Sequence, residues 1–142
     1  MTKQPMRILV VDDSRDAADC LAAILAAADY DAHVAYDGKH AVALAATFRP
    51  HVVFLDIDMP GMNGYATARH LRNMVADQAP VLIALTAHSD SYAVAATEQA
   101  GFDLHLVKPC DVSYLLDLLM RTVLRVRDCA RASVAPARLG EI

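Results

Sequence analysis

The sequence predicts an α/β fold, a single doubly wound parallel sheet with helices on both faces. Short apolar runs alternate with segments whose apolar residues recur at helical spacing, from near the amino terminus to about residue 126. Strands that alternate with helices of this length are joined by right-handed crossovers, which makes the sheet parallel. Because 142 residues is the length of one ordinary domain, we expect one sheet of five strands with five helices.

The first elements are a strand over 7–11 and a helix that Ser14 can cap. The apolar face of that helix comprises Ala17, Leu21, Ile24, Leu25 and Ala28. A second strand is expected over 32–36, ending at the turn pair Asp37-Gly38. It carries His33 and is less continuously apolar than the other strands, so we expect it at an edge of the sheet.

Proline and glycine mark the boundaries of the later elements. Pro50 and Pro80 precede strands, the turn-forming segment 59–64 precedes a helix, and Gly101 stands where a helix is expected to end. The remaining expected strands are 51–56, 81–85 and 104–107, and the remaining expected helices are 39–48, 65–74, 91–100 and one that Asp111 can cap. The periodic pattern of this last helix fades near residue 126.

Four of the apolar runs end on residues that phosphoryl chemistry uses. They end at the pair Asp12 and Asp13, at Asp56, at Thr86 and at Lys108. The ends of parallel strands with the same polarity lie along one edge of the sheet, and ligands bind in the crevice there. We therefore expect these side chains to converge on one site.

The predicted site combines clustered carboxylates with a hydroxyl and an ammonium group. Carboxylates this close resist simultaneous ionisation unless a cation joins them, and Mg²⁺ prefers oxygen ligands that phosphate oxygens can complete. An aspartate beside Mg²⁺ can attack phosphorus and form an aspartyl phosphate. Thr86 and Lys108 would then stabilise the phosphoryl oxygens. The chain has no P-loop or dinucleotide fingerprint, so nucleotide binding is not expected.

Five segments of the sequence match the pattern of one known family. They are Ile8-Leu9-Val10-Val11-Asp12-Asp13, Leu55-Asp56 followed by Met59-Pro60-Gly61-Met62-Asn63-Gly64, Leu85-Thr86-Ala87, Ala100-Gly101-Phe102-Asp103, and Lys108-Pro109. Over about residues 6–126 the chain resembles the receiver domain of two-component response regulators, and it is similar to receivers attached to hybrid histidine kinases. The resemblance implies a flavodoxin-like fold with strand order 2-1-3-4-5 and a cis Lys108-Pro109 peptide.

The resemblance also implies the roles of the site residues. Asp56 would accept a phosphoryl group from a histidine kinase or a histidine phosphotransfer protein, so the chain would be no enzyme beyond its own phosphorylation and dephosphorylation. Thr86 and Lys108 would bind the phosphoryl oxygens. The implied Mg²⁺ ligands are Asp13 and Asp56 directly, Asp12 through water, and Asp58 through its backbone carbonyl.

Two positions depart from the commoner family pattern. His105 occupies the place where many receivers carry a switching Tyr or Phe, so we expect it either to act in the switch or to be an ordinary solvated strand residue. Asp58 lies two residues after the acceptor, where its carboxylate can affect the entry of water or phosphate, and His88 can share that rim.

Two other functions remain as alternatives. The segment 53–58 resembles the opening motif of haloacid-dehalogenase-type phosphatases, in which one Asp is the nucleophile and the next is the general acid. That motif occupies the first core strand of its family, whereas here the segment follows two earlier strands and an acid pair. The other alternative is an interaction module that needs no phosphate, although every residue of the expected phosphoryl site is present.

Composition narrows the class of protein further. The net charge of −4 and the 56% hydrophobic content disfavour a disordered chain and a strongly basic nucleic-acid binder. We find no signal peptide and no apolar run of about 20 residues, so we expect a cytoplasmic protein with no membrane partner. The three cysteines lack metal-like spacing and are expected to be free thiols. The expected divisions are a tail over 1–5, a receiver domain over 6–126 and a tail over 127–142, with an unidentified output protein.

Overall fold

The structure is a computed structural model, and it describes part of the chain. The described residues are 5–57, 64–73, 80–86, 95, 99–108 and 111–134, with the side chains of 123 and 125–134 left out. Contacts within the chain divide it into two units, Met1–Lys108 and Pro109–Ile142. The first unit contains the sheet and its helices, and the described residues of the second contain one helix.

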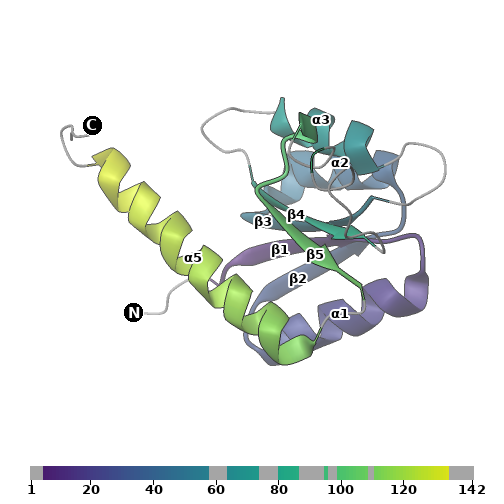
Figure 1. The fold of residues 1–142 in the computed structure, drawn as a ribbon, viewed down its shortest axis with the longest axis horizontal. Coiled ribbons are helices and arrows are strands. Elements are labelled where there is room, and N and C mark those ends of the chain that lie inside the picture. Colours follow the sequence, from purple (N-terminus) through teal and green to yellow (C-terminus); the bar gives the residue numbers. More distant parts are fainter. Residues whose placement is uncertain are drawn as a thin grey trace. The chain divides into compact units, whose positions relative to one another are not determined.

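The first unit is built on a parallel sheet of five strands in the order β2-β1-β3-β4-β5 (Figure 1). The strands are β1 (Arg7–Val11), β2 (Asp31–Ala35), β3 (Val52–Asp56), β4 (Val81–Thr86) and β5 (Leu104–Val107). Each neighbouring pair is parallel. The predicted fold class and strand order are therefore confirmed, and β2 lies at an edge as its sequence indicated.

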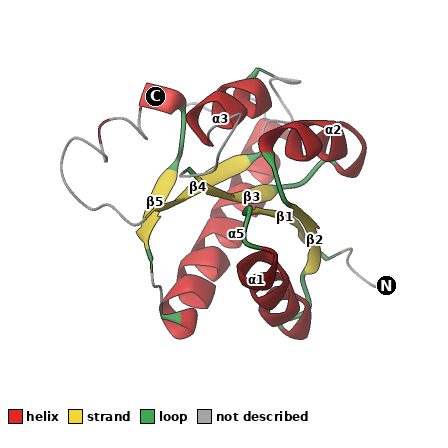
Figure 2. Cartoon of the chain, turned by 90° about the vertical axis from the view of Figure 1, so that its right-hand side faces the viewer, coloured by secondary structure: helices red, strands yellow, loops and turns green. Residues whose placement is uncertain are grey.

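Helices cover both faces of this sheet. Helix α1 (Arg15–Ala27) lies on one face, and α2 (Gly38–Phe48) and α3 (Gly64–Arg72) lie on the other (Figure 2). Of the helix expected over 91–100, Ala95, Gln99 and Ala100 are helical, and its other residues lie outside the described part of the chain. The doubly wound arrangement follows from the alternation of strands and helices.

Side-chain caps begin α1 and α2. The Ser14 hydroxyl accepts a hydrogen bond from the backbone N–H of Ala17 at 3.3 Å, which confirms the expected cap. Asp37 caps α2 in the same way by accepting from the N–H of His40 at 2.7 Å. Because Asp37 is a cap and not only a turn residue, α2 begins one residue earlier than predicted, at Gly38.

Two glycines are required by their surroundings. Gly101 has φ of 98°, a backbone conformation that other residues rarely adopt, and it follows helical residues as expected. A Cβ atom at Gly64 would lie 2.2 Å from the Cα atom of Ile57, so α3 can start this close to the residue after β3 only with glycine. Gly64 thus brings α3 against the end of β3.

The core explains why the strands read as continuous apolar runs. Every residue of β3 is buried, as are the last four residues of β1 and the last five of β4. Strands covered on both faces must be apolar at each position, whereas the edge strand β2 is only partly buried. One cluster on this sheet joins Leu9, Val11, Val53, Leu55, Leu82 and Ala84 to Ala41, Ala45, Ala68 and Leu71 of the helices.

The second unit contains α5, which extends over Val112–Val134. The apolar pattern predicted a helix that fades near residue 126, so the observed helix is longer than expected. The segment after Val126 is rich in Arg and Ala, which favour helix without supplying an apolar face. Among the described residues, no helix has the length and apolar character needed to cross a membrane.

Candidate functional site

Three carboxylates meet at the carboxyl edge of the sheet. Asp12 and Asp13 directly follow β1, and Asp56 is the last residue of the neighbouring strand β3. Asp12 and Asp56 are buried and Asp13 is exposed, yet one carboxylate oxygen from each lies within 4.8 Å of the others. The three acids expected to converge therefore do so, and they form a set of oxygen donors that can hold a metal ion.

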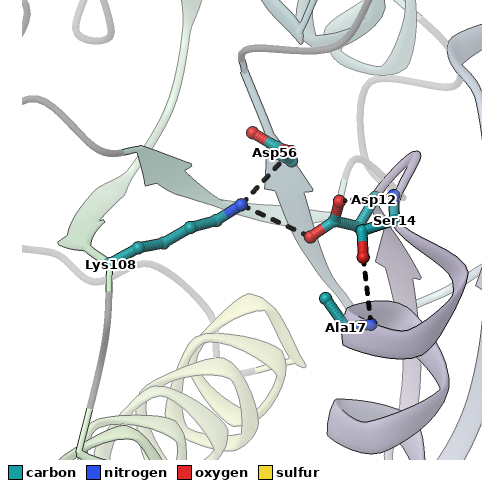
Figure 3. A network of polar contacts seen from close by, with 5 residues as sticks. All are labelled: Asp12, Ser14, Ala17, Asp56 and Lys108. Atoms are coloured by element: carbon teal, nitrogen blue, oxygen red, sulfur yellow. Dashed lines mark hydrogen bonds and ion pairs between the residues drawn. The ribbon is translucent and has the colours of Figure 1, made fainter.

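The ammonium group of Lys108 reaches both buried carboxylates. Its Nζ lies 3.2 Å from Oδ2 of Asp56 and 3.4 Å from Oδ2 of Asp12 (Figure 3). Lys108 follows β5, and its side chain extends toward the ends of β3 and β1 (Figure 3). The Lys108 side chain remains 36% exposed, so solvent reaches part of the lysine.

Asp12 is held by the chain that leads into α1. Its Oδ1 accepts a hydrogen bond from the backbone N–H of Ser14 at 3.0 Å, and its own N–H donates to the carbonyl of Ala35 at 3.2 Å. Sequence reasoning recognised Ser14 as a helix cap but missed its backbone contact with Asp12. The signal was an aspartate two residues before a cap, since such side chains accept from the N–H of residue i+2.

Burial and neighbouring charges both change the pKa values of Asp12 and Lys108. Burial raises the pKa of Asp12, the Ser14 N–H lowers it, and the nearby Asp56 carboxylate raises it again, with raising effects prevailing. Partial burial lowers the pKa of Lys108, but attraction to Asp56 and Asp12 outweighs that effect and raises it. Lys108 is therefore a cation at neutral pH, and two buried carboxylates share it. This arrangement favours the entry of a further cation.

Thr86 lies at the same edge of the sheet. It is the last residue of β4 and is fully buried. Its carbonyl accepts a hydrogen bond from the N–H of Lys108 at 2.7 Å, and it pairs in register with Val107. Thr86 thus stands one residue after Leu85, which is the partner of Asp56 in the sheet. Strand β4, which ends at Thr86, lies between β3, which ends at Asp56, and β5, which Lys108 follows.

Some predicted features lie outside the described residues. These are Asp58, His88 and the Lys108–Pro109 peptide bond. His105 is described, and the residue as a whole is partly buried. Its Nε2 is buried and has no hydrogen-bond partner among the residues that the structure describes. It pairs in register with Ala84, two residues before Thr86.

The matching family profile and two similar relatives all belong to the response regulators. The profile of the response regulator receiver domain matches residues 8–120. Response regulator MprA of Mycolicibacterium vanbaalenii is 40% identical over 121 residues, which cover 85% of this chain and 51% of that protein. The DNA-binding response regulator MtrA of Mycobacterium tuberculosis is 37% identical over 109 residues, which cover 77% of this chain and 46% of that protein. The chain therefore spans about half the length of these relatives.

Solved structures agree in fold. Chemotaxis protein CheY4 of Vibrio cholerae superposes with a TM-score of 0.77 at 28% identity, covering 82% of this chain and 98% of that one. The receiver domain of a signal transduction histidine kinase from Syntrophus aciditrophicus gives a TM-score of 0.74 at 32% identity, covering 82% of this chain and 88% of that one. Both likenesses extend over the greater part of the chain.

Proposed function

This chain belongs to the response regulator receiver domain family, and from that membership we propose that it is the phosphoacceptor of a two-component phosphorelay, with Asp56 as the phosphorylated residue. The observation that carries the proposal is the position of Asp56. It is buried at the end of β3, lies in the carboxylate group with Asp12 and Asp13, and has the Lys108 ammonium 3.2 Å from its Oδ2. An acid held between metal-binding oxygens and a cation suits attack on a phosphoryl group.

The carboxylate group fits Mg²⁺. All its donors are carboxylate oxygens, and two of them are buried where an unpaired charge is unfavourable. We propose Asp13 and Asp56 as direct ligands, Asp12 as a ligand through water, and the backbone carbonyl of Asp58 as a further ligand. Bound Mg²⁺ would neutralise charge on the acceptor and on the phosphoryl oxygens.

The proposed transfer step needs no other reactant. A carboxylate oxygen of Asp56 forms a bond to phosphorus while the bond from phosphorus to a donor histidine nitrogen breaks. That nitrogen keeps the electron pair, and the imidazole leaves as a neutral ring because its other nitrogen carries a proton. Lys108 offsets the charge on the phosphoryl oxygens, and the Thr86 hydroxyl donates a hydrogen bond to one of them.

The donor would be a histidine kinase or a histidine phosphotransfer protein, and phosphorylation would switch a surface that an output protein recognises. We propose that this takes place in the cytoplasm, with a receiver domain over 6–126 and tails over 1–5 and 127–142. The name of MtrA includes DNA binding, which is a property of that protein. For the 142 residues of this chain, with a net charge of −4, we propose no nucleic-acid partner and no membrane partner.

The test is phosphorylation by acetyl phosphate with Mg²⁺, followed by intact-mass measurement. The wild type should gain one phosphoryl group and Asp56→Asn none. The exposed carboxylate of Asp16, in the first turn of α1, offers a matched control, and Asp16→Asn should be labelled like the wild type. Labelling that persists in Asp56→Asn would place the acceptor elsewhere. Continuous release of inorganic phosphate from a generic phosphomonoester would instead support the haloacid-dehalogenase alternative.

A further inference from the structure

A cation is held near the proposed phosphoryl site by residues that the site does not use. The Cζ atom of Arg15 lies 4.2 Å from the centroid of the Tyr36 ring. The Tyr36 hydroxyl in turn donates a hydrogen bond of 2.6 Å to Oδ1 of Asp19. Arg15 and Asp19 belong to α1, and Tyr36 directly follows β2. These contacts place the guanidinium over the ring, while Arg15 as a residue is exposed.

The position of Arg15 is unfavourable for its own helix. It is the first residue of α1, where the positive end of the helix macrodipole disfavours a cation and favours an acid such as the adjacent Asp16. Stacking on an aromatic ring contributes roughly 0.5–1 kcal/mol at an exposed site, which offsets that effect. Arg15 is unfavourable at the start of a helix and is nevertheless oriented by an aromatic ring. Such a conflict with helix preference indicates a role outside the helix.

The surroundings place this cation at the same sheet edge as the carboxylates. Tyr36 follows Ala35, whose carbonyl accepts the N–H of Asp12. Strand β1 lies between β2 and β3, so the ends of β2 and β3 are two strand spacings apart, roughly 10 Å. Arg15 stacks on Tyr36, the residue after β2, and follows Asp13 by two residues, so we take roughly 10 Å as the scale of its separation from Asp56. This separation is about one Debye length at 0.1 M salt. The charge of Arg15 therefore acts on the site without touching it.

The negative charge of the site suggests a role for the positive charge of Arg15. Three carboxylates lie together, and the one ammonium group that contacts them in the described part of the chain, Lys108, is paired with two of them. A phosphoryl donor carries a charge of about −2 at neutral pH, so this acidic edge repels it. We propose that Arg15, oriented by Tyr36, is a positioning residue that draws anionic phosphodonors toward Asp56. This inference rests on the proposed phosphoacceptor function.

Acetyl phosphate is a suitable probe because its transfer is balanced and involves no protein partner. A carboxylate oxygen of Asp56 bonds to phosphorus, the bond from phosphorus to the acetyl oxygen breaks, and acetate leaves with the electron pair. Arg15 takes no part in the bonds. Arg15 raises the local concentration of the dianion near Asp56, and this increases the rate of phosphorylation. Salt screens the attraction and so suppresses the increase.

The decisive comparison is Arg15→Gln against Arg69→Gln. Arg69 is an exposed arginine in the last turn of α3, away from the helix start that follows β3, so its removal changes the net charge equally. Coulomb's law in water gives about a fourfold effect of a unit charge on a dianion at roughly 10 Å. At low salt and saturating Mg²⁺, the second-order rate of phosphorylation should fall about fourfold in Arg15→Gln and stay unchanged in Arg69→Gln.

Metal binding separates positioning from simple loss of structure. Without Arg15 the site is more negative, so calorimetry should show Mg²⁺ binding that is tighter by up to about fourfold. A damaged site would instead bind both Mg²⁺ and donor more weakly. In 1 M KCl the rate difference between wild type and Arg15→Gln should disappear, because the Debye length is then only about 3 Å.

The outcomes are distinguishable. Equal low-salt rates for wild type and Arg15→Gln, or weaker Mg²⁺ binding in the variant, would overturn the role of Arg15 while leaving Asp56 as acceptor. Absence of any Asp56 adduct in the wild type would overturn the phosphoacceptor function itself. Tyr36→Phe, which keeps the ring under the guanidinium, should retain most of the rate, whereas Tyr36→Leu should lose part of it.

Discussion

At the scale of single residues, the proposed site contains three carboxylates and one contacting ammonium group in the described part of the chain. Lys108 serves both Asp12 and Asp56, and Asp13 completes the group from the exposed side. Asp13 is exposed, and its carboxylate oxygen lies within 4.8 Å of one oxygen of each buried acid. Asp13 is therefore the member whose removal tests metal binding with the least disturbance of the fold.

We predict that Asp13→Asn weakens Mg²⁺ binding at least about tenfold, because a direct carboxylate ligand and its charge are both lost. Calorimetric titration of the folded variant with Mg²⁺ measures the effect. Asp16→Asn, an exposed acid on the following helix, should bind Mg²⁺ within about twofold of the wild type. Equal affinity of wild type and Asp13→Asn would remove Asp13 from the set of ligands.

A second residue-scale prediction concerns His105. Its buried Nε2 has no hydrogen-bond partner in the described part of the chain, and an unsatisfied buried polar group costs about 1–3 kcal/mol. His105→Phe keeps a flat ring and removes the polar atom, so the free energy of unfolding should rise by about 1 kcal/mol in urea denaturation. His33→Phe, at an exposed position on β2, is the control and should change stability less. A destabilised His105→Phe would mean that the nitrogen has a favourable role in the resting state.

At the scale of elements, His51 ties the amino ends of three strands together. Its Nδ1 accepts the backbone N–H of Arg7 at 3.0 Å, its N–H donates to the Arg7 carbonyl, and its own carbonyl accepts the N–H of Val81. The residue directly before β3 thus joins β1 and β4. Only a neutral imidazole can accept at Nδ1, which makes this junction sensitive to protonation.

We predict that this junction weakens in acid. Burial, and then the charge of Arg7, lower the pKa of His51 in the folded state below its ordinary value of 6.5. Since the unfolded chain takes up the proton first, the contribution is present above about pH 6.5 and is lost as the pH falls below it toward the folded pKa. The raised pKa of Asp12 has the opposite effect on the pH dependence of stability. The contribution of His51 is therefore measured as the difference in the free energy of unfolding between wild type and His51→Gln.

Urea denaturation at several pH values from 7.5 to 5 checks this prediction. The stability advantage of the wild type over His51→Gln should shrink as the solution becomes acidic. An advantage that stays constant over this range would show that His51 does not change protonation on unfolding. The His40→Gln variant, at an exposed position on α2, controls for the loss of a histidine side chain as such.

At the scale of the whole molecule, strand order creates the site. Asp12 and Lys108 are 96 residues apart in sequence and meet because β1, β3, β4 and β5 lie side by side. The connection after β1 leads to α1 on one face, while the connection after β3 leads to α3 on the other (Figure 2). In doubly wound sheets, ligands bind where neighbouring connections turn to opposite faces in this way, and Asp12, Asp13 and Asp56 stand at these two strand ends.

The sequence by itself determined the elements and the list of chemical groups, because both depend on local signals. Apolar runs, the Ser14 cap and Gly101 predicted strands and helix ends close to those observed, and the four strand ends named Asp12, Asp13, Asp56, Thr86 and Lys108. The length of α5 was missed, since helix propensity continues past Val126 after the apolar pattern has ended.

Only the tertiary structure decided how groups from distant strands meet. The shared contact of Lys108 with two carboxylates, the hydrogen bond from Arg7 to His51, the Arg15–Tyr36 stack and the burial of His105 Nε2 all depend on it. No local pattern specifies them, because register, crossing and burial are properties of the packed chain as a whole. The same carboxylates in another strand order would lie strands apart, with no common ammonium and no place for a metal ion.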